Sequence, residues 1–260
     1  MPELPEVANY ALVARRAIGK RIESADLRRP KILGGVSHGR LEAFLKDQRF
    51  TDTRRHGKFL FLRLSGGKWL GLHFGLSGLL SYSLRPKAEE GGVMDVLFED
   101  GSRLRYRGLF GRVDVLEKPE DFIRRLSLGP DAMAVSFERF KSILTERRKT
   151  PVKSVFMDQK NLAGVGNLYS DEALFRARIH PLTHAGDLDP REIKRLYDEL
   201  RRVLAAVTKQ RAKGEWVFPK NYLASRRGAE GRCPRCGAAL GMLLIGGRSA
   251  YFCPKEQPKP

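Results

Sequence analysis

The stretch MDQKNLAGVGNLY, residues 157–169, carries the strongest structural pattern in this chain. Gly164 and Gly166 flank a turn between two segments of helical character. The backbone N–H groups at the start of the second segment and the side-chain amide of Asn167 are donors that suit one phosphate group. Glycine permits the close approach that such a contact needs, because it has no side chain. The stretch therefore predicts two helices joined by a phosphate-binding turn.

The composition predicts a polyanionic partner. The 260 residues include 49 Lys and Arg against 30 Asp and Glu, which gives a formal net charge of +19. Neutralisation of phosphates is the usual reason for such an excess. Ribosomal RNA and a membrane surface are alternatives on charge alone, although no stretch is apolar enough to span a bilayer and no signal peptide is present. We expect a prokaryotic cytoplasmic protein that associates with the nucleoid.

The N-terminal half has the pattern of a β-rich domain. Short apolar runs of strand length alternate there with hairpin signals such as Asp100-Gly101. An apolar stripe at helical spacing over residues 7–17 precedes them. We expect an antiparallel β-sandwich with an N-terminal helix over residues 1–116, followed by a linker at 117–134.

The rest of the chain has helical periodicity and ends in a cysteine-bearing hairpin. The clearest helix spans residues 189–211, and Asp189 and Glu192 form a capping box at its start. We expect a helix–two-turn–helix DNA-binding domain over residues 135–228 and a zinc-ribbon-like β-hairpin at 229–260. The whole chain is thus expected to be an α+β protein of two domains.

The first six residues, MPELPE, place a proline beside two carboxylates. Removal of Met1 makes Pro2 an N-terminal secondary amine, and an α-amino group with a pKa of roughly 8 is nucleophilic near neutral pH. Such an amine attacks a carbonyl-like carbon to form an iminium, as lysine does in Schiff-base enzymes. Glu3 and Glu6 are close enough in sequence to transfer protons beside it. The alternative is an ordinary chain start in which a proline merely opens a helix.

Four stretches together resemble the formamidopyrimidine-DNA glycosylase / endonuclease VIII family of bifunctional DNA repair enzymes. They are PELPEV at 2–7, Lys58 in a basic hairpin, Met157–Pro181 and Cys233–Cys253, and they occur in the order of the family. The resemblance covers nearly the whole chain. It implies a monomer that acts on double-stranded DNA with an oxidised base or an abasic site. It also implies attack of Pro2 on the sugar C1′ through a Schiff base, followed by strand cleavage through β/δ-elimination.

The same resemblance implies roles for individual residues. The implied catalytic residues are Pro2, Glu3, Glu6 and Lys58. The implied phosphate-binding residues are His73, Lys153, Asn167 and Arg248. The side chains that would fill the gap left by a flipped base are Leu76, Leu109 and Phe110. From the sequence alone, a structural role for His73 and a core position for Phe110 are the alternatives.

The cysteine pattern resembles the zinc finger of the family with one departure. Cys233-x-x-Cys236 is followed after sixteen residues by Cys253, and Glu256 stands where the family has a fourth thiol. Paired Cys-x-x-Cys motifs form tetrahedral zinc sites, and a carboxylate oxygen is also a zinc ligand. We therefore expect one structural zinc ion bound by Cys233, Cys236, Cys253 and Glu256. The alternative is a ribbon that folds on apolar contacts without a metal.

Two further departures bear on substrate choice. The loop before Phe110 is shorter than usual in the family, and the arginine that reads the base opposite the lesion is absent. The loop at 214–222 lacks the Gly-Gly-Thr/Ser run of the purine-specific branch. Both favour a preference other than strict 8-oxoguanine:cytosine specificity. A second hypothesis for the whole chain is a non-catalytic binder of damaged or structured DNA on the same scaffold.

Overall fold

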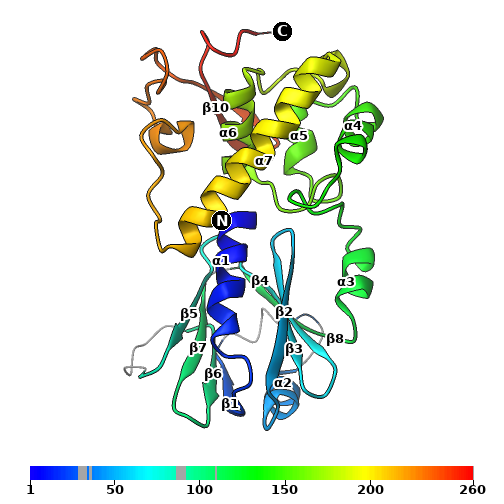
Figure 1. Cartoon of the computed structure of the whole chain (residues 1–260), viewed down its shortest axis with the longest axis vertical. Helices are drawn as coiled ribbons and strands as arrows, with labels where there is room; N and C mark the ends of the chain where they lie inside the picture. The colour runs from blue at the N-terminus through cyan, green and yellow to red at the C-terminus, as the bar shows by residue number, and fades with distance from the viewer. Residues whose placement is uncertain (29–33, 35–36, 86–91, 109, 260) are drawn as a thin grey trace. The chain divides into compact units, whose positions relative to one another are not determined.

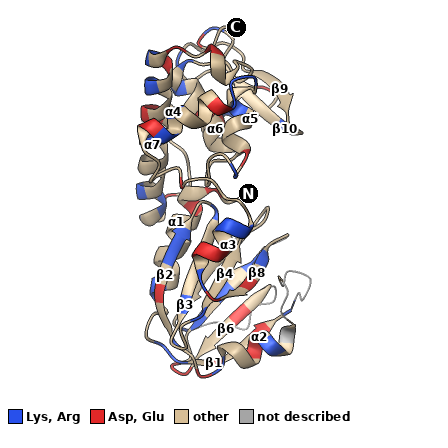
Figure 2. Ribbon diagram, turned by 90° about the vertical axis from the view of Figure 1, so that its right-hand side faces the viewer, with Lys and Arg blue, Asp and Glu red and all other residues tan. Residues whose placement is uncertain are grey.

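The computed structural model describes residues 1–28, 34, 37–85, 92–108 and 110–259. They form two compact units, Met1–Ser127 and Leu128–Pro260 (Figure 1). Each unit has buried apolar clusters of its own. Basic residues occur on helices and strands of both units (Figure 2), as the net charge of +19 requires. Within the described part of the chain, no helix combines the length and the apolar character needed to cross a membrane.

The N-terminal unit contains two four-stranded antiparallel sheets. The strands of one sheet are, in spatial order, β1 (Ile22–Leu27), β6 (Met94–Phe98), β7 (Arg103–Arg107) and β5 (Leu79–Ser83). The strands of the other are β2 (Phe50–His56), β3 (Phe59–Leu64), β4 (Trp69–His73) and β8 (Arg112–Leu116). Residues of both sheets join one buried apolar cluster, which includes Leu62 of β3 and Val96 of β6. The expected antiparallel β-sandwich is confirmed.

Helix α1 (Leu4–Arg15) packs against strands of both sheets (Figure 1). Glu3 is its N-cap residue, and the reciprocal bonds of a capping box join Glu3 to Glu6. The buried residues Val7, Tyr10 and Ala14 follow one another at helical spacing. The predicted N-terminal helix is therefore confirmed. A short helix α2 (His38–Leu45) packs beside β1.

Helix α3 (Pro119–Arg125) occupies part of the stretch that was expected to be a linker. Phe122 packs there with Phe61, Trp69 and Leu116, which form a second apolar cluster on the β2–β3–β4–β8 sheet. On β3, Phe61 points away from the main cluster because successive strand residues face opposite sides. Pro119 is the first residue of this helix, a position where proline is well tolerated.

The C-terminal unit is helical and ends in a two-stranded ribbon. Its α-helices are α4 (Phe137–Glu146), α5 (Val152–Met157), α6 (Asn167–Ala177) and α7 (Pro190–Ala212). Its 3₁₀ turns are η2 (Ala185–Asp187) and η3 (Leu223–Arg226). Helices α5 and α6 are the predicted pair around the glycine-containing turn, and α7 packs against α6. The predicted capping box of Asp189 and Glu192 begins α7.

The side chain of Gln159 organises the turn between α5 and α6. Its Nε2 donates to the carbonyls of Met157 at 3.0 Å and Val165 at 2.7 Å, and its Oε1 accepts the N–H of Gly164 at 3.0 Å. Gly164 has a φ of 111°, a conformation that favours glycine. Gly166 is the N-cap residue of α6. The local sequence therefore fixes where α6 begins.

The ribbon consists of β9 (Gly241–Ile245) and β10 (Arg248–Phe252). Ile245 faces Arg248 across a two-residue turn. Gly246 and Gly247 have φ values of 55° and 71°, and such a turn requires positive φ at both central residues. The predicted hairpin is confirmed, and it exposes Arg248 directly after the turn.

Candidate active site and nucleic-acid interface

The expected nucleophile, Pro2, directly precedes α1. Pro2 and Glu3 are both buried, and only 3% of Glu3 is exposed. The carboxylate of Glu6 accepts the backbone N–H of Glu3 at 3.0 Å, which holds the chain rigid next to Pro2. An amine at Pro2 would therefore sit beside an ordered carboxylate.

Lys58 and His73 bring two nitrogen donors to one edge of the sandwich. Lys58 is buried and follows Gly57, whose φ of 55° makes the β2–β3 turn tight. Burial, together with the charges of Lys58 and Arg112, lowers the pKa of His73 to about 4, so the ring is neutral at pH 7. Its Nδ1 accepts the N–H of Gly75 at 3.3 Å. The proton of the neutral ring is therefore on Nε2, where it is a donor.

Leu76 and Phe110 lie on two loops that pack closely together. A Cβ on Gly108 would lie 2.6 Å from the Cα of Gly78, so the loops approach backbone to backbone. Leu76 is 45% exposed and Phe110 is 76% exposed. Large apolar side chains exposed on adjacent loops are typical of an interaction surface. Phe110 is therefore not a core residue, and Leu109 lies outside the described residues.

Two tyrosines anchor this part of the N-terminal unit. The hydroxyl of Tyr106 donates to the carbonyl of His73 at 3.0 Å. The hydroxyl of Tyr10, on α1, donates to the carbonyl of Gly78 at 2.8 Å. Helix α1 is thus tied directly to the loop that bears Leu76. The same helix carries the expected nucleophile at its start. Helix α1 therefore positions both this residue and the exposed apolar loop.

In the C-terminal unit, a polar surface pocket of about 560 Å³ involves the start of α6 and the ribbon turn. It is lined by Asn167, Leu168, Ala224, Arg227, Gly247, Arg248, Ser249 and Tyr251. The Nδ2 of Asn167 donates to the carbonyl of Ser249 at 3.0 Å, which joins helix and ribbon. A helix N-terminus beside two arginines suits an anion. Two predicted phosphate ligands, Asn167 and Arg248, are therefore brought together.

Lys153, a further predicted phosphate ligand, does not line this pocket. Its side chain is 0% exposed, and its ammonium is paired with the carboxylate of Asp171. The same ammonium donates to Ser170 Oγ at 3.2 Å and to the carbonyl of Asn167 at 3.3 Å. An enclosed and paired ammonium does not reach a DNA phosphate. Lys153 instead ties α5 to the first turn of α6.

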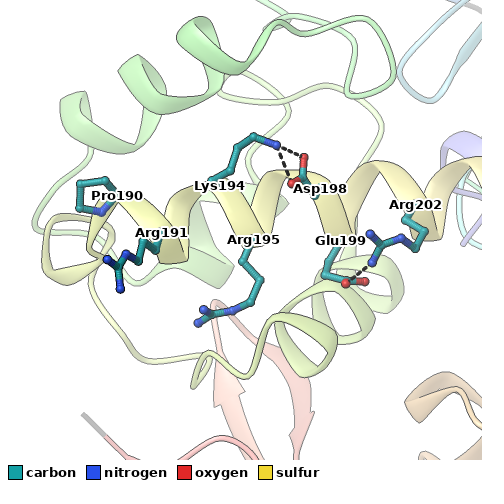
Figure 3. Close-up of a pocket in the computed structure, with 7 residues that line it drawn as sticks. All are labelled: Pro190, Arg191, Lys194, Arg195, Asp198, Glu199 and Arg202. Carbon is teal, nitrogen blue, oxygen red and sulfur yellow. Dashed lines mark hydrogen bonds and ion pairs between the residues drawn. The ribbon is translucent and has the colours of Figure 1, made fainter.

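A second surface pocket, of about 480 Å³, runs along the first half of α7 (Figure 3). Most of its charged side chains pair with each other on the same helix. Lys194 bonds Asp198 four residues later, and Arg202 pairs with Glu199 three residues earlier. Compensated charges of this kind favour no particular ligand. We assign this pocket no role.

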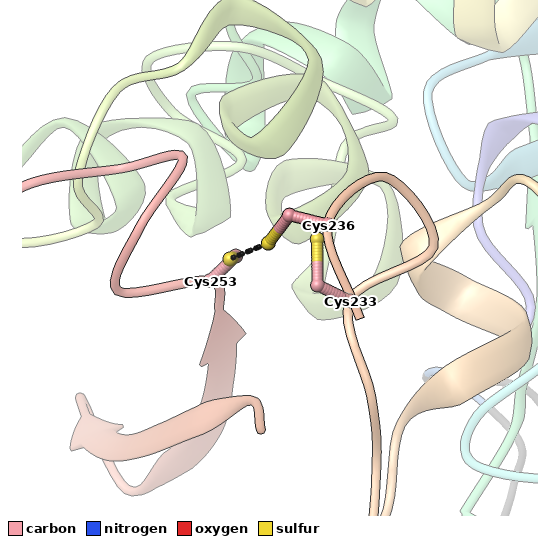
Figure 4. A group of neighbouring side chains, drawn as sticks. All are labelled: Cys233, Cys236 and Cys253. Atoms are coloured by element: carbon pink, nitrogen blue, oxygen red, sulfur yellow. Dashed lines mark hydrogen bonds between the residues drawn. The ribbon is translucent and has the colours of Figure 1, made fainter. Parts of the chain in front are cut away.

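Three thiols form a compact cluster beside the ribbon. The Sγ atoms of Cys233, Cys236 and Cys253 all lie within 4.8 Å of one another (Figure 4). Burial raises the pKa of Cys253 to about 11, whereas a hydrogen bond from the backbone of Ala238 lowers the pKa of Cys236. Thiolates at this spacing supply three of the four ligands that a tetrahedral metal site needs. The cluster therefore fits a structural metal ion.

Glu256, the expected fourth ligand, does not group with the three thiols in this structure. Within the described ranges, the potential metal ligands grouped there are three thiols and no carboxylate. The carboxylate of Glu256 lies 3.5 Å from both the Arg178 and the Arg235 guanidinium nitrogens. The next residue, Gln257, is buried and accepts the N–H of Cys253 at 2.9 Å. Ion pairs and an amide thus hold this segment in place.

Family models match most of the chain. The formamidopyrimidine-DNA glycosylase N-terminal domain matches residues 1–112, and the H2TH domain of the same enzymes matches residues 126–215. The formamidopyrimidine-DNA glycosylase of Heliobacterium modesticaldum is 36% identical, with 99% of this chain and 100% of that protein covered. That of Symbiobacterium thermophilum is 34% identical, with 100% of this chain and 90% of that protein covered. The chain belongs to the formamidopyrimidine-DNA glycosylase family.

Membership of the formamidopyrimidine-DNA glycosylase family makes the protein a base-excision-repair glycosylase, and AP lyase activity is general in this family. Solved structures agree on the fold. Lactococcus lactis Fpg (MutM) in complex with DNA containing N7-benzyl-Fapy-dG is 24% identical, with a TM-score of 0.86 and coverage of 99% of this chain and 100% of that one. The same enzyme with abasic-site DNA is 23% identical, also with a TM-score of 0.86 and the same coverage. The predicted family and two-domain fold are confirmed.

Sequence reasoning missed Arg227, which lines the pocket beside Arg248. Arg227 belongs to a basic run in which no spacing distinguishes one arginine from its neighbours. Arg226, the residue before it, is exposed and does not line the pocket. The packing of η3 against α6 places Arg227 rather than Arg226 in the pocket beside Asn167 and Arg248.

The environment of His73 predicts a pH-dependent part of the folding stability. Its pKa is about 4 in the folded protein and near 6.5 in the unfolded chain, so only the unfolded chain takes up a proton between these values. The contribution is fully present above the unfolded pKa and is lost as the pH falls through the folded pKa. A pKa shift of this size corresponds to a contribution of at most about 3 kcal/mol to the free energy of unfolding.

Denaturant unfolding between about pH 7.5 and pH 4 measures this contribution. In a Trp216→Phe background, the fluorescence of Trp69 reports on the N-terminal unit alone. As the pH falls over this range, the free energy of unfolding of the background protein should decrease by up to about 3 kcal/mol more than that of the same protein with His73→Asn. Parallel stability curves for the two proteins would contradict the assignment.

Proposed function

We propose that the protein removes oxidised bases from double-stranded DNA through a Schiff base at Pro2 and then nicks the strand at the abasic sugar. The observation that carries the proposal is the position of Pro2 beside buried Glu3, at the capped start of α1. The partner is supported by the Lactococcus lactis relative, which has been solved with Fapy-dG-containing and abasic-site DNA. We propose that the protein acts as a monomer on the bacterial chromosome.

The reaction begins when Pro2, freed of Met1, attacks the sugar C1′. The new C–N bond forms as the bond from C1′ to the base breaks, and the departing base takes a proton from water. The Pro2 nitrogen, now a tertiary ammonium, passes its proton to Glu3. Glu3 then protonates the ring oxygen as the sugar opens to an iminium. The iminium acidifies the 2′ C–H, and loss of that proton expels the 3′ phosphate. A second elimination expels the 5′ phosphate, and hydrolysis of the imine releases the enzyme.

Glu6 takes a supporting part in this scheme. Its carboxylate already accepts the N–H of Glu3 at 3.0 Å. That bond fixes the backbone on which both Pro2 and the Glu3 carboxylate depend. We therefore propose that Glu6 acts by positioning Glu3 and that the proton passes through Glu3 itself.

Access to C1′ requires the damaged nucleotide to leave the base stack. Leu76 and Phe110 are exposed apolar side chains that can fill the resulting gap. Lys58 and His73 offer an ammonium and a neutral N–H donor to the DNA backbone from the N-terminal unit. Asn167 and Arg248 offer donors from the C-terminal unit. The absent opposite-base arginine favours activity with more than one opposite base.

Replacement of Pro2 tests the proposed mechanism. In protein shown by mass spectrometry to lack Met1, Pro2→Gly should slow base release at least about 100-fold under single-turnover conditions, because a secondary-amine nucleophile is lost. Binding to a duplex with a tetrahydrofuran abasic analogue should change by less than about 3-fold. Glu3→Gln should slow base release with the nucleophile intact.

Pro5→Ala is the matched control, since it removes a proline from the first turn of the same helix. It should leave base release within a few-fold of the unaltered protein. Equal losses in Pro2→Gly and Pro5→Ala would mean that Pro2 is structural. No base release from any oxidised duplex by binding-competent protein would favour the non-catalytic binder.

We further propose that the thiolates of Cys233, Cys236 and Cys253 hold one zinc ion. The support is their mutual distance and the family membership of the chain. The ion would cross-link the turn at Cys233–Cys236 to the end of β10, next to the ribbon that carries Arg248. Its role is structural, and no chemical step involves it.

Metal analysis of purified protein tests the ligand set. We expect about one zinc per chain, lost in Cys253→Ser and retained in Glu256→Gln, because Glu256 is engaged by two arginines rather than by the metal. Glu256→Cys, which restores a fourth thiol, should hold zinc against chelator for longer. Loss of zinc in Glu256→Gln would show that the carboxylate is a ligand, and a zinc-free starting protein would reject the site.

A further inference from the structure

Arg227 meets Asn167 at a single backbone carbonyl beside Arg248. The guanidinium Nη2 of Arg227 donates to the carbonyl of Ser249 at 3.0 Å, and the Nδ2 of Asn167 donates to the same oxygen at 3.0 Å. Ser249 follows Arg248 on β10, and all four residues line one pocket. Arg227 therefore lies next to the two residues already assigned to phosphate binding.

The orientation of the Arg227 guanidinium is fixed from two sides. Its central carbon lies 4.9 Å from the ring centroid of Tyr251, and its Nη2 lies 3.3 Å from the Asp171 carboxylate. Only 18% of the side chain is exposed. Its Nε is enclosed with no hydrogen-bond acceptor among the residues that the structure describes. A planar cation held in this way loses little conformational entropy when it binds a ligand.

Asp171 does not cancel the charge of Arg227, because its carboxylate is shared. One oxygen pairs with the ammonium of Lys153, and the other lies near Arg227 and accepts the N–H of Tyr251 at 3.1 Å. One carboxylate between two cations leaves a positive potential at the pocket. The N-terminal end of α6 adds to that potential.

We propose that Arg227 is a second cationic ligand of the DNA phosphate that binds at the start of α6, together with Asn167 and Arg248. The inference rests on the proposed function, since it requires DNA in this pocket. The two arginines differ in their exposure and in how firmly their side chains are held. Arg248 is exposed at the ribbon turn, whereas Arg227 is held in place before DNA arrives. A preorganised cation loses less conformational entropy on binding the phosphate than an exposed, flexible one does.

The test compares Arg227→Ala with Arg226→Ala, which removes the same charge from the adjacent exposed position. Binding to a duplex with a tetrahydrofuran abasic analogue is measured from about 50 to 300 mM KCl. Arg227→Ala should weaken binding at least about 10-fold and flatten the slope of log K against log salt by up to about one. Arg226→Ala should weaken binding less than about 3-fold.

Arg227→Gln distinguishes loss of the positive charge from a purely structural effect. Glutamine keeps a donor for the Ser249 carbonyl but carries no charge, so it should flatten the salt slope as alanine does while the melting temperature stays near that of the unaltered protein. An unchanged slope in Arg227→Gln, or equal effects of Arg226→Ala and Arg227→Ala, would overturn the assignment.

Arg248→Ala in the same series separates this inference from the proposed function. A flattened slope for Arg248→Ala with an unchanged slope for both Arg227 variants would reject only the role of Arg227. Unchanged slopes for the Arg227 and Arg248 variants alike would mean that no DNA phosphate binds in this pocket. Flattened slopes for both arginines would support the shared phosphate site.

Discussion

A nucleophile at the end of a chain must be immobilised, because chain termini fray unless they are tied down. The hydrogen bond from the Glu3 N–H to the Glu6 carboxylate does this by closing the first turn of α1 directly after Pro2. The rest of the N-terminal unit supports that turn. Helix α1 packs on both sheets, and Tyr10 bonds the loop that presents Leu76. The β-sandwich thus holds the N-terminal segment, with the proposed nucleophile Pro2, beside an ordered carboxylate.

In the C-terminal unit, a buried carboxylate joins several segments and fixes their positions. Asp171 pairs with Lys153 on α5, with Arg227 after η3, and with the backbone of β10. Three segments that are distant in sequence are thereby held around the start of α6, where Asn167 and Arg248 meet. Removal of the fully buried Lys153 ammonium would leave the Asp171 charge poorly compensated, which generally costs several kcal/mol. The polar pocket beside α6 therefore depends on one shared carboxylate.

Local signals were sufficient to predict much of the fold. The capping box that begins α7, the Gly246-Gly247 hairpin and the turn that ends at Gly166 each depend on residues close in sequence. What the sequence could not reveal depends on tertiary contacts. The burial of Lys153 follows from its pairing with a carboxylate on another helix. The ion pairs of Glu256 similarly involve arginines from other segments, so spacing alone suggested a metal ligand instead.

The central claim is that the Pro2 nitrogen forms a covalent bond with the sugar. Borohydride reduction during reaction with a duplex that carries an abasic site traps such an imine as a stable amine. Digestion and mass spectrometry should then locate the DNA adduct on the N-terminal peptide, at Pro2 of protein that lacks Met1. An adduct on a lysine such as Lys58, or no adduct from binding-competent protein without Met1, would contradict the account.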